Sequence, residues 1–247
     1  MQAILIRVGI DSTTDSGKWN APCNPKNGDF VYVPIRETNR TNALGTKKRY
    51  DNQIIPALDK FSERNNHTIS LPPYLFDEPM HLDPDFDYLT YGDTERRGKP
   101  LLKFVEDDLV IFYASLDPIK PITNDKLEYA LIGMLVMKEI VQVKDISDTG
   151  RFDENAHTRI SSPKPTDIVA RGKQEVSGRF ESYIPIGEYR DDAYRVQRSL
   201  LDKWGGLSVK NGYLQRSANP PLFRQPERFF NWLQQQNPQL MQANNPS

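Results

Sequence analysis

The sequence predicts an α+β fold with a mixed sheet that is strongly curved or partly closed into a barrel, with helices at its periphery. Apolar runs of strand length predict the sheet, and two late segments with helical spacing of apolar residues predict the helices. Nineteen prolines and fourteen glycines, scattered rather than repeated, indicate many turns between short elements. We expect a single domain over residues 1–236, and a flexible tail over the Gln-, Asn- and Pro-rich residues 237–247.

The strand predictions depend on β-branched and aliphatic runs bounded by turn residues. Residues 3–10 are rich in Ile, Leu and Val, and residues 109–114 have the composition of a central strand. Residues 129–143 suit a long strand that bends at Gly133. Further strands are expected at residues 30–35, 167–171 and 179–186.

Helical spacing occurs in three places. Ile54, Ile55, Leu58 and Phe61 predict a short helix that starts near Pro56. Residues 191–204 predict a second helix, ended by two glycines. A third helix is expected after Pro226, and the basic residues 36–49 are expected to form an exposed loop.

The charge distribution limits the classes of partner. A formal net charge of −1 argues against a protein that coats nucleic acid or membrane by bulk attraction. Residues 1–150 hold 18 basic and 23 acidic side chains, a balance of −5, so the remaining 14 basic and 10 acidic side chains give residues 151–247 a balance of +4. The second part can present a basic face to phosphates, or simply a solvated face.

Cysteine content and hydropathy indicate in which cellular compartment the protein is expected. Cys23 is the single cysteine, which excludes an internal disulfide and a multi-cysteine metal site. The first residues do not resemble a signal peptide, and no run approaches the roughly 20 apolar residues of a membrane span. We therefore expect a cytoplasmic protein with no membrane partner.

Residues 77–93 form the first candidate site, with six carboxylates in seventeen residues and no lysine or arginine. Such a segment can bind a divalent metal through oxygen atoms or hold a general acid–base pair, and its aspartates can equally serve turns and caps. His81 and Asp83 are the candidate catalytic residues here, because the chain has only three histidines. The segment lacks EF-hand spacing and the zinc-protease helix pattern, and no cofactor or metal is predicted.

Two later segments also carry polar side chains suited to a ligand. Asn155, His157 and Arg159 can hydrogen-bond a base edge or a phosphate, or can cap a loop. Tyr213 and Arg216 can stack on a base and contact a phosphate, or can pack as an ordinary core tyrosine and surface arginine. A convergence of His157 with His81 would favour a functional site.

Several motifs carry a resemblance to known families. The apolar strand at 109–114, followed by a second strand with Gly133, resembles the PUA-like small barrels, which include the EVE and YTH readers of modified bases. Together with residues 6–11, 81–86, 91–93 and 155–157, it resembles the third of the bacterial and phage nucleotide-modification-associated domain families, over residues 3–220. The three tryptophans are widely spread in the sequence, unlike the cage of YTH readers.

The resemblance implies a role beside DNA modification, in phage biology or in defence against phage. The leading hypothesis is a module that binds DNA or a modified nucleotide, with the base out of its stack in a polar and aromatic pocket. The predicted catalytic residues are His81, Asp83 and His157, and the predicted ligand-binding residues are Asp11, Trp19, Tyr91, Asp93, Tyr113, Asn155, Arg159 and Arg216.

Two alternatives stay open. The first is an enzyme acting on nucleotides or modified bases, with Asp83 or Asp85 as base and His81 or His157 as acid, with or without a metal. The second is a protein-interaction module without a small-molecule site. A buried carboxylate that faces a histidine in a closed pocket would favour the enzyme, and an open basic groove with stacking aromatics would favour the reader.

Overall fold

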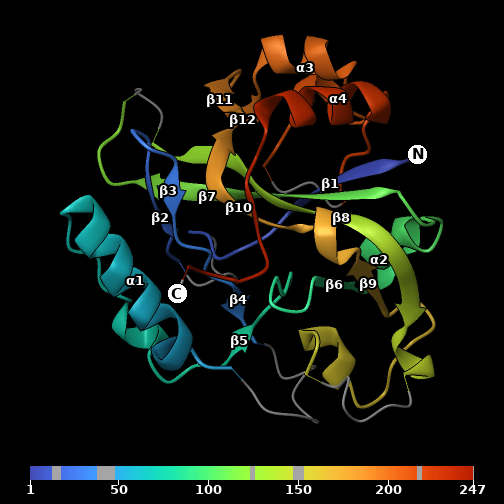
Figure 1. Cartoon of the computed structure of the whole chain (residues 1–247), viewed down its shortest axis with the longest axis horizontal. Helices are drawn as coiled ribbons and strands as arrows, with labels where there is room; N and C mark the ends of the chain where they lie inside the picture. The colour runs from blue at the N-terminus through green and yellow to red at the C-terminus, as the bar shows by residue number, and fades with distance from the viewer. Residues whose placement is uncertain (13–17, 38–47, 123–125, 147–152, 216–218, 247) are drawn as a thin grey trace.

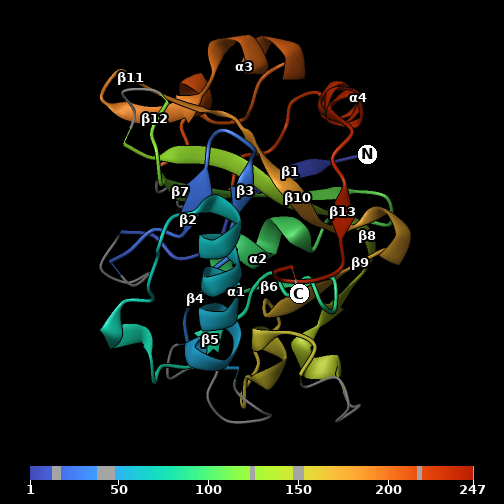
Figure 2. The same ribbon diagram turned by 60° about the vertical axis from the view of Figure 1, so that its left-hand side comes forward.

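The computed structural model describes residues 1–12, 18–37, 48–122, 126–146, 153–215 and 219–246. Its mixed sheet is strongly curled into a half-barrel with helices around it, which confirms the predicted fold class (Figure 1). Figure 2 shows α1 (Tyr50–Asn65) standing along one side of the sheet, while α3 (Arg198–Trp204) and α4 (Pro226–Gln236) lie together at one end.

The middle of the sheet is formed by the two longest strands, β7 (Leu109–Pro118) and β8 (Glu128–Gln142), which pair antiparallel. β1 (Ala3–Arg7) pairs parallel with β7. On its other side β1 contacts residues 221–223, through a bridge between Ile4 and Leu222 and a hydrogen bond from Leu5 N to Pro221 O of 2.8 Å. The first strand is thus paired on both sides, as expected for a buried run.

β8 is long enough to join two parts of the sheet. Its first half pairs with β10 (Gly178–Pro185), and its second half pairs with β9 (Ile168–Gly172). β9 in turn pairs with β6 (Thr90–Asp93). At Gly133 a Cβ would lie 2.7 Å from the Phe86 ring, so the glycine admits this ring against the sheet where the register shifts.

Shorter elements complete the structure. They are β2 (Pro22–Asn24), β3 (Asp29–Phe30), β4 (Ile35–Arg36), β5 (Met80–His81), α2 (Glu95–Leu101), β11 (Gly187–Arg190), β12 (Ala193–Val196), β13 (Leu240–Met241) and the 3-10 helices Pro73–Leu75, Val143–Asp145, Ala156–Arg159, Gln174–Val176 and Lys210–Gly212.

Both faces of the sheet are buried, because alternate side chains of β7 enter two different cores. Val110, Phe112 and Ala114 belong to a first core, which extends beneath α1. Leu109, Ile111 and Tyr113 belong to a second core, which α3 and α4 cover. This double burial accounts for the continuous apolar run that predicted the strand.

The prediction of a single strand over residues 30–35 was wrong. The structure has β3 and β4 at its two ends, and residues 31–34 are buried without regular pairing. Val31 N donates to Pro22 O and Val33 O accepts from Ile10 N, so two different segments take the hydrogen bonds. Pro34 has no N–H with which to continue a ladder.

The expected start of the first helix near Pro56 was also wrong, since α1 begins at Tyr50 and contains Pro56. Pro56 is on the exposed side of the helix, where a carbonyl that loses its helical partner can bind water. Most of the loop predicted at 36–49 lies outside the described residues, but Glu37, within it, has a buried carboxylate.

The helix expected over residues 191–204 is confirmed only in its second half. Residues 187–196 form the β11–β12 hairpin, with Asp191 and Asp192 at φ 50° and 56°. Two consecutive positive φ angles give a turn whose twist matches paired strands. The helix spans Arg198–Trp204, and Gly205, whose φ is 77°, caps its end.

Residues 237–246 run back over the molecule. Leu240 and Met241 pair with β10, Asn245 Oδ1 accepts from Tyr32 N at 2.9 Å, and Asn244 Oδ1 accepts from Phe86 N at 2.8 Å. The flexibility of this tail and the domain boundary at residue 236 stay predictions. Among the described residues, no helix has both the length and the apolar character needed to cross a membrane.

Candidate functional site

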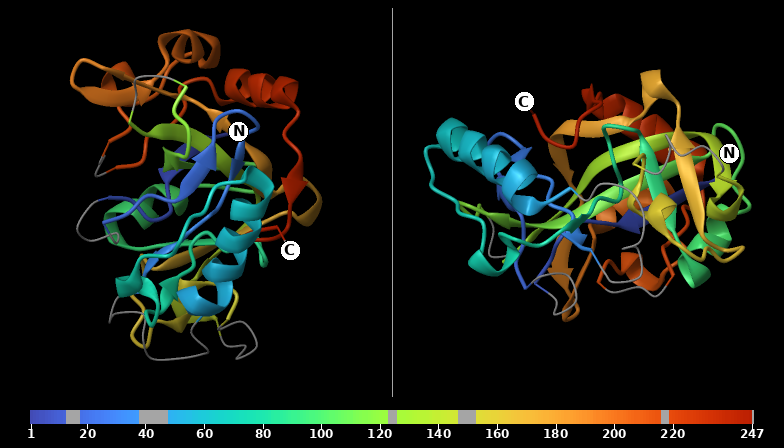
Figure 3. Two further views of the ribbon diagram at one scale, coloured as in Figure 1. Left: turned by 90° about the vertical axis from the view of Figure 1, so that its left-hand side faces the viewer. Right: turned by 90° about the horizontal axis from the view of Figure 1, so that it is seen from below.

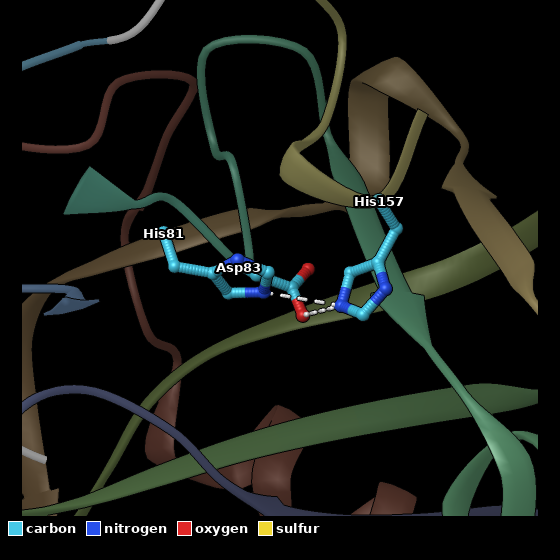
Figure 4. A group of neighbouring side chains, drawn as sticks. All are labelled: His81, Asp83 and His157. Atoms are coloured by element: carbon cyan, nitrogen blue, oxygen red, sulfur yellow. Dashed lines mark hydrogen bonds and ion pairs between the residues drawn. The ribbon is translucent and has the colours of Figure 1, made fainter. Parts of the chain in front are cut away.

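β5 (Met80–His81) lies at the end of the molecule opposite α3 and α4 (Figures 1 and 3), and there two histidines and an aspartate from two segments of the chain meet. His81 is on β5, Asp83 follows it, and His157 is on the 3-10 helix Ala156–Arg159. Figure 4 shows the three side chains pointing toward one another. We call these residues the His–Asp–His cluster.

The geometry of the cluster is tight. Nε2 of His81 lies 3.1 Å from Nε2 of His157, and the rings meet edge to face with centroids 4.8 Å apart. Nε2 of His157 is also 3.5 Å from Oδ2 of Asp83. Both histidines are 9% exposed, and the contact between their Nε2 atoms is buried.

Asp83 is held by its other oxygen. Oδ1 accepts hydrogen bonds from Gly92 N at 2.7 Å and from Asn155 Nδ2 at 2.9 Å. Asn155, which is fully buried, also accepts from His157 N at 2.9 Å through Oδ1. One amide side chain therefore orients both Asp83 and the turn that carries His157, and Oδ2 of Asp83 is directed into the cluster.

His81 is held from behind by a buried ion pair. Its Nδ1 lies 3.1 Å from Oε1 of Glu37, and Oε2 of Glu37 accepts from Arg159 Nη2 at 2.9 Å. The Glu37 side chain is 1% exposed and that of Arg159 6%. Because a carboxylate only accepts hydrogen bonds, this contact puts the proton of a neutral His81 on Nδ1 and leaves a lone pair on Nε2.

Gly92 makes room for the second histidine. A Cβ there would lie 2.3 Å from Cδ2 of His157 and 2.6 Å from Oδ1 of Asn155. Its φ angle is not positive, so the requirement for glycine is one of close approach rather than of backbone conformation.

Arg97 and Arg7 connect the β6 residues Tyr91 and Asp93 to Asp11 through polar contacts. Arg97 contacts Asp93 at 3.4 Å and donates to the Tyr91 hydroxyl at 3.3 Å and to the Arg7 carbonyl at 3.5 Å. Arg7 in turn forms an ion pair with Asp11 at 2.9 Å. Asp11, Tyr91 and Asp93 are thus linked by side chains, although Asp11 is not in contact with the histidines.

Two pKa shifts accompany this arrangement. Burial raises the pKa of Asp93, and the neighbouring Arg97 guanidinium and Tyr91 hydroxyl only partly offset it. Burial opposes a charge on His157, but the hydrogen bond and charge of Asp83, with the charge of Asp93, outweigh it and raise the His157 pKa. His157 is therefore a better proton acceptor than a histidine in water.

The aromatic residues expected to form a pocket wall are occupied in the core. Tyr91 and Tyr113 are each 2% exposed; the Tyr91 ring packs on Phe112 and the Tyr113 hydroxyl donates to Leu214 O at 2.7 Å. Trp19 is partly buried against the first core. Their ring faces are thus largely used in packing, and Arg216 lies outside the described residues.

The other carboxylates of the acidic segment pair with residues outside the His–Asp–His cluster. Asp85 is buried and pairs with Lys48 at 3.0 Å, whereas the exposed Asp77 pairs with Arg49 at 2.8 Å. Asp83 is the carboxylate of residues 77–93 that reaches the histidines.

The sequence reasoning missed Glu37, Gly92 and Arg97. Glu37 had a signal, since it is the one acidic residue among the basic residues 36–49. Gly92 lies in the segment 91–93 that carries the family resemblance, but its role, like that of Arg97, depends on the position of β6 behind His157.

The chain matches a protein-family model. The family model described as nucleotide modification associated domain 3 matches residues 2–220, which include every residue of the site. No curated protein and no solved structure shows a significant match to the chain.

Proposed function

Since the chain belongs to the nucleotide modification associated domain 3 family, we propose that it is an enzyme acting on a nucleotide or a modified base. The observation that carries the proposal is the convergence of His81, Asp83 and His157, with the two Nε2 atoms 3.1 Å apart and Asp83 3.5 Å from His157. A link to phage biology or to defence against phage, and DNA as the bearer of the base, are parts of the same proposal.

Catalysis is favoured over recognition alone by the kind of groups present. A shielded carboxylate beside two histidines is an arrangement suited to acid–base catalysis or to holding a catalytic metal ion. Reading a base by stacking instead needs free aromatic faces, and Tyr91 and Tyr113 use theirs in the core.

The hydrogen bonds behind the cluster support the same function. Asn155 and Gly92 hold Asp83 from one side, and Glu37 holds His81 from the other. Such supporting contacts keep reactive groups in one orientation before the substrate binds.

The test is a turnover assay on free nucleotides and on oligonucleotides with and without modified bases, with products identified by mass spectrometry. We expect Asp83→Asn and His157→Gln to lower kcat by about 10²- to 10⁴-fold, the usual contribution of a positioned acid or base. The matched control is Asp77→Asn, which lies in the same acidic segment but is exposed and pairs with Arg49.

Unchanged turnover in Asp83→Asn, with the fold intact by circular dichroism, would contradict the proposal. Binding that depends on base modification, without turnover of any member of the panel, would instead identify the chain as a reader.

A further inference from the structure

We propose that His81, Asp83 and His157 bind a divalent transition-metal ion through Nε2, Oδ2 and Nε2. The inference deepens the proposed function, because the ion would belong to the same site, but the binding itself can be measured without any substrate.

The first argument is the set of atoms that face one another. The contact with Glu37 leaves a lone pair on Nε2 of His81, and that atom faces Nε2 of His157 and, beyond it, Oδ2 of Asp83. The ligand atoms of the three residues all lie within 4.8 Å of one another. Electron-rich atoms gathered in this way repel one another unless a proton or a cation lies between them, and a cation can satisfy all three at once.

The second argument is distance. Ligand atoms about 2.1 Å from an ion and about 90–110° apart around it are separated by roughly 3.0–3.4 Å. The two Nε2 atoms are 3.1 Å apart, and Nε2 of His157 is 3.5 Å from Asp83. Only the pair of His81 and Asp83 is wider, within 4.8 Å, so a small side-chain rotation would close the set on an ion.

The third argument is the support behind two of the three ligands, His81 and Asp83, whereas Nδ1 of His157 has no hydrogen-bond partner among the described residues. Metal-binding histidines commonly donate their second ring N–H to a carboxylate, as His81 does to Glu37, and metal-binding carboxylates are themselves hydrogen-bonded, as Asp83 is by Gly92 and Asn155. Arg159 balances the charge of Glu37. The negative charge left for the cation is therefore that of Asp83.

The chemistry of the ligands indicates the class of ion. Two imidazoles suit iron, zinc and related transition metals, whereas magnesium and calcium prefer oxygen ligands alone. Two histidines and one carboxylate occupy one side of such an ion and leave other positions for water or a substrate.

The test uses metal-free full-length protein titrated with Co²⁺, followed by visible absorption, and with Zn²⁺, followed by calorimetry. We expect about one ion per chain and no displacement by excess Mg²⁺. His81→Ala, His157→Ala and Asp83→Asn should each weaken binding at least ~100-fold. The matched control is His67→Ala, which changes the third histidine of the chain, outside the cluster.

Glu37→Gln is the decisive second variant, because it leaves all three ligands in place. It should weaken Co²⁺ binding about 10- to 100-fold through the loss of the carboxylate behind His81. This keeps the proposal open to test even where a ligand variant fails to fold.

The inference is overturned if the metal-free protein does not bind Co²⁺ or Zn²⁺, or if its affinity is the same in the native chain, His157→Ala and Glu37→Gln. Turnover that survives complete removal of metal would overturn a role for the ion in the reaction while leaving the proposed function standing. Specific metal binding without turnover would support the metal site and contradict the proposed function.

Discussion

The two ends of the molecule are held together by different forces. At one end Trp204, Phe223, Phe229 and Trp232 pack ring against ring, with centroids between 3.9 and 5.9 Å apart. At the other end the His–Asp–His cluster is fixed by hydrogen bonds and ion pairs with defined donors and acceptors. We call the first set the aromatic cluster.

The aromatic cluster mainly stabilises the fold, whereas the contacts of the His–Asp–His cluster mainly position its side chains. The hydrophobic contribution of the buried rings is large and non-directional, so the aromatic cluster stabilises the fold without paired donors and acceptors. Buried polar groups gain little net stability, yet hydrogen bonds are directional and hold the atoms they join in defined positions. We therefore expect substitutions at the two ends to change different measurements.

The largest stability effect is expected from Trp204→Ala. The side chain is fully buried among Phe223, Phe229 and Trp232, so its loss leaves a cavity and should cost about 3–5 kcal/mol in the free energy of unfolding. Urea denaturation gives this value, and Co²⁺ affinity of the folded variant should be unchanged. A cost below about 1 kcal/mol would contradict the role given to the aromatic cluster.

Gly92→Ala should show the opposite pattern. The added methyl group would lie 2.3 Å from the His157 ring, so the ring must move. Overpacking of this kind costs about 1–3 kcal/mol, and the displaced histidine should lower turnover and Co²⁺ affinity at least tenfold. Native affinity in this variant would show that His157 can shift without loss of the site.

Alkaline pH tests whether the two ends unfold together. Burial raises the pKa of Tyr32, Tyr50, Tyr91 and Tyr113. The folded state keeps these tyrosine protons above about pH 10, where the unfolded chain releases them. The free energy of unfolding is therefore unaffected by these tyrosines below about pH 10, and above it falls by about 1.4 kcal/mol per pH unit for each tyrosine.

Near- and far-ultraviolet circular dichroism should therefore be lost in one transition, because Tyr91 on β6 near the cluster and Tyr113 in the second core must both be exposed before they ionise. Two separate transitions would mean that the ends are independent units, against the single domain predicted from the sequence.

The smallest effect is expected from Asp77→Ala. The carboxylate is exposed and its partner Arg49 is half-exposed, so the free energy of unfolding should change by less than about 1 kcal/mol. Turnover should equal that of the native chain. A clear loss of activity would show that the acidic segment acts as a whole rather than through Asp83.

Much of the sheet was predictable, because a strand that is buried on both faces has a continuous apolar sequence, as β7 and β8 do. The β11–β12 hairpin was not, since Tyr194, Leu200 and Leu201 also fit helical spacing. The turn depends on two aspartates with positive φ, a conformation that aspartate adopts only at some positions.

The site was predictable only in part. The scarcity of histidine singled out His81 and His157, and the acidic segment supplied Asp83. Glu37 was not found, because its importance arises from burial beside Arg159, 122 residues away in the chain. Sequence patterns describe the neighbours of a residue in the chain, and this site is made of neighbours in space.

The pairing of β1 has a consequence for how the chain reaches its fold. Its partners are residues 109–113 on one side and 221–223 on the other, so neither edge is satisfied by a local contact. Such high contact order implies slow folding, on the order of milliseconds to seconds, because long loops must close first. Until residues 221–223 arrive, β1 presents an apolar strand edge to other chains, and low protein concentration or chaperones should improve the yield of refolding.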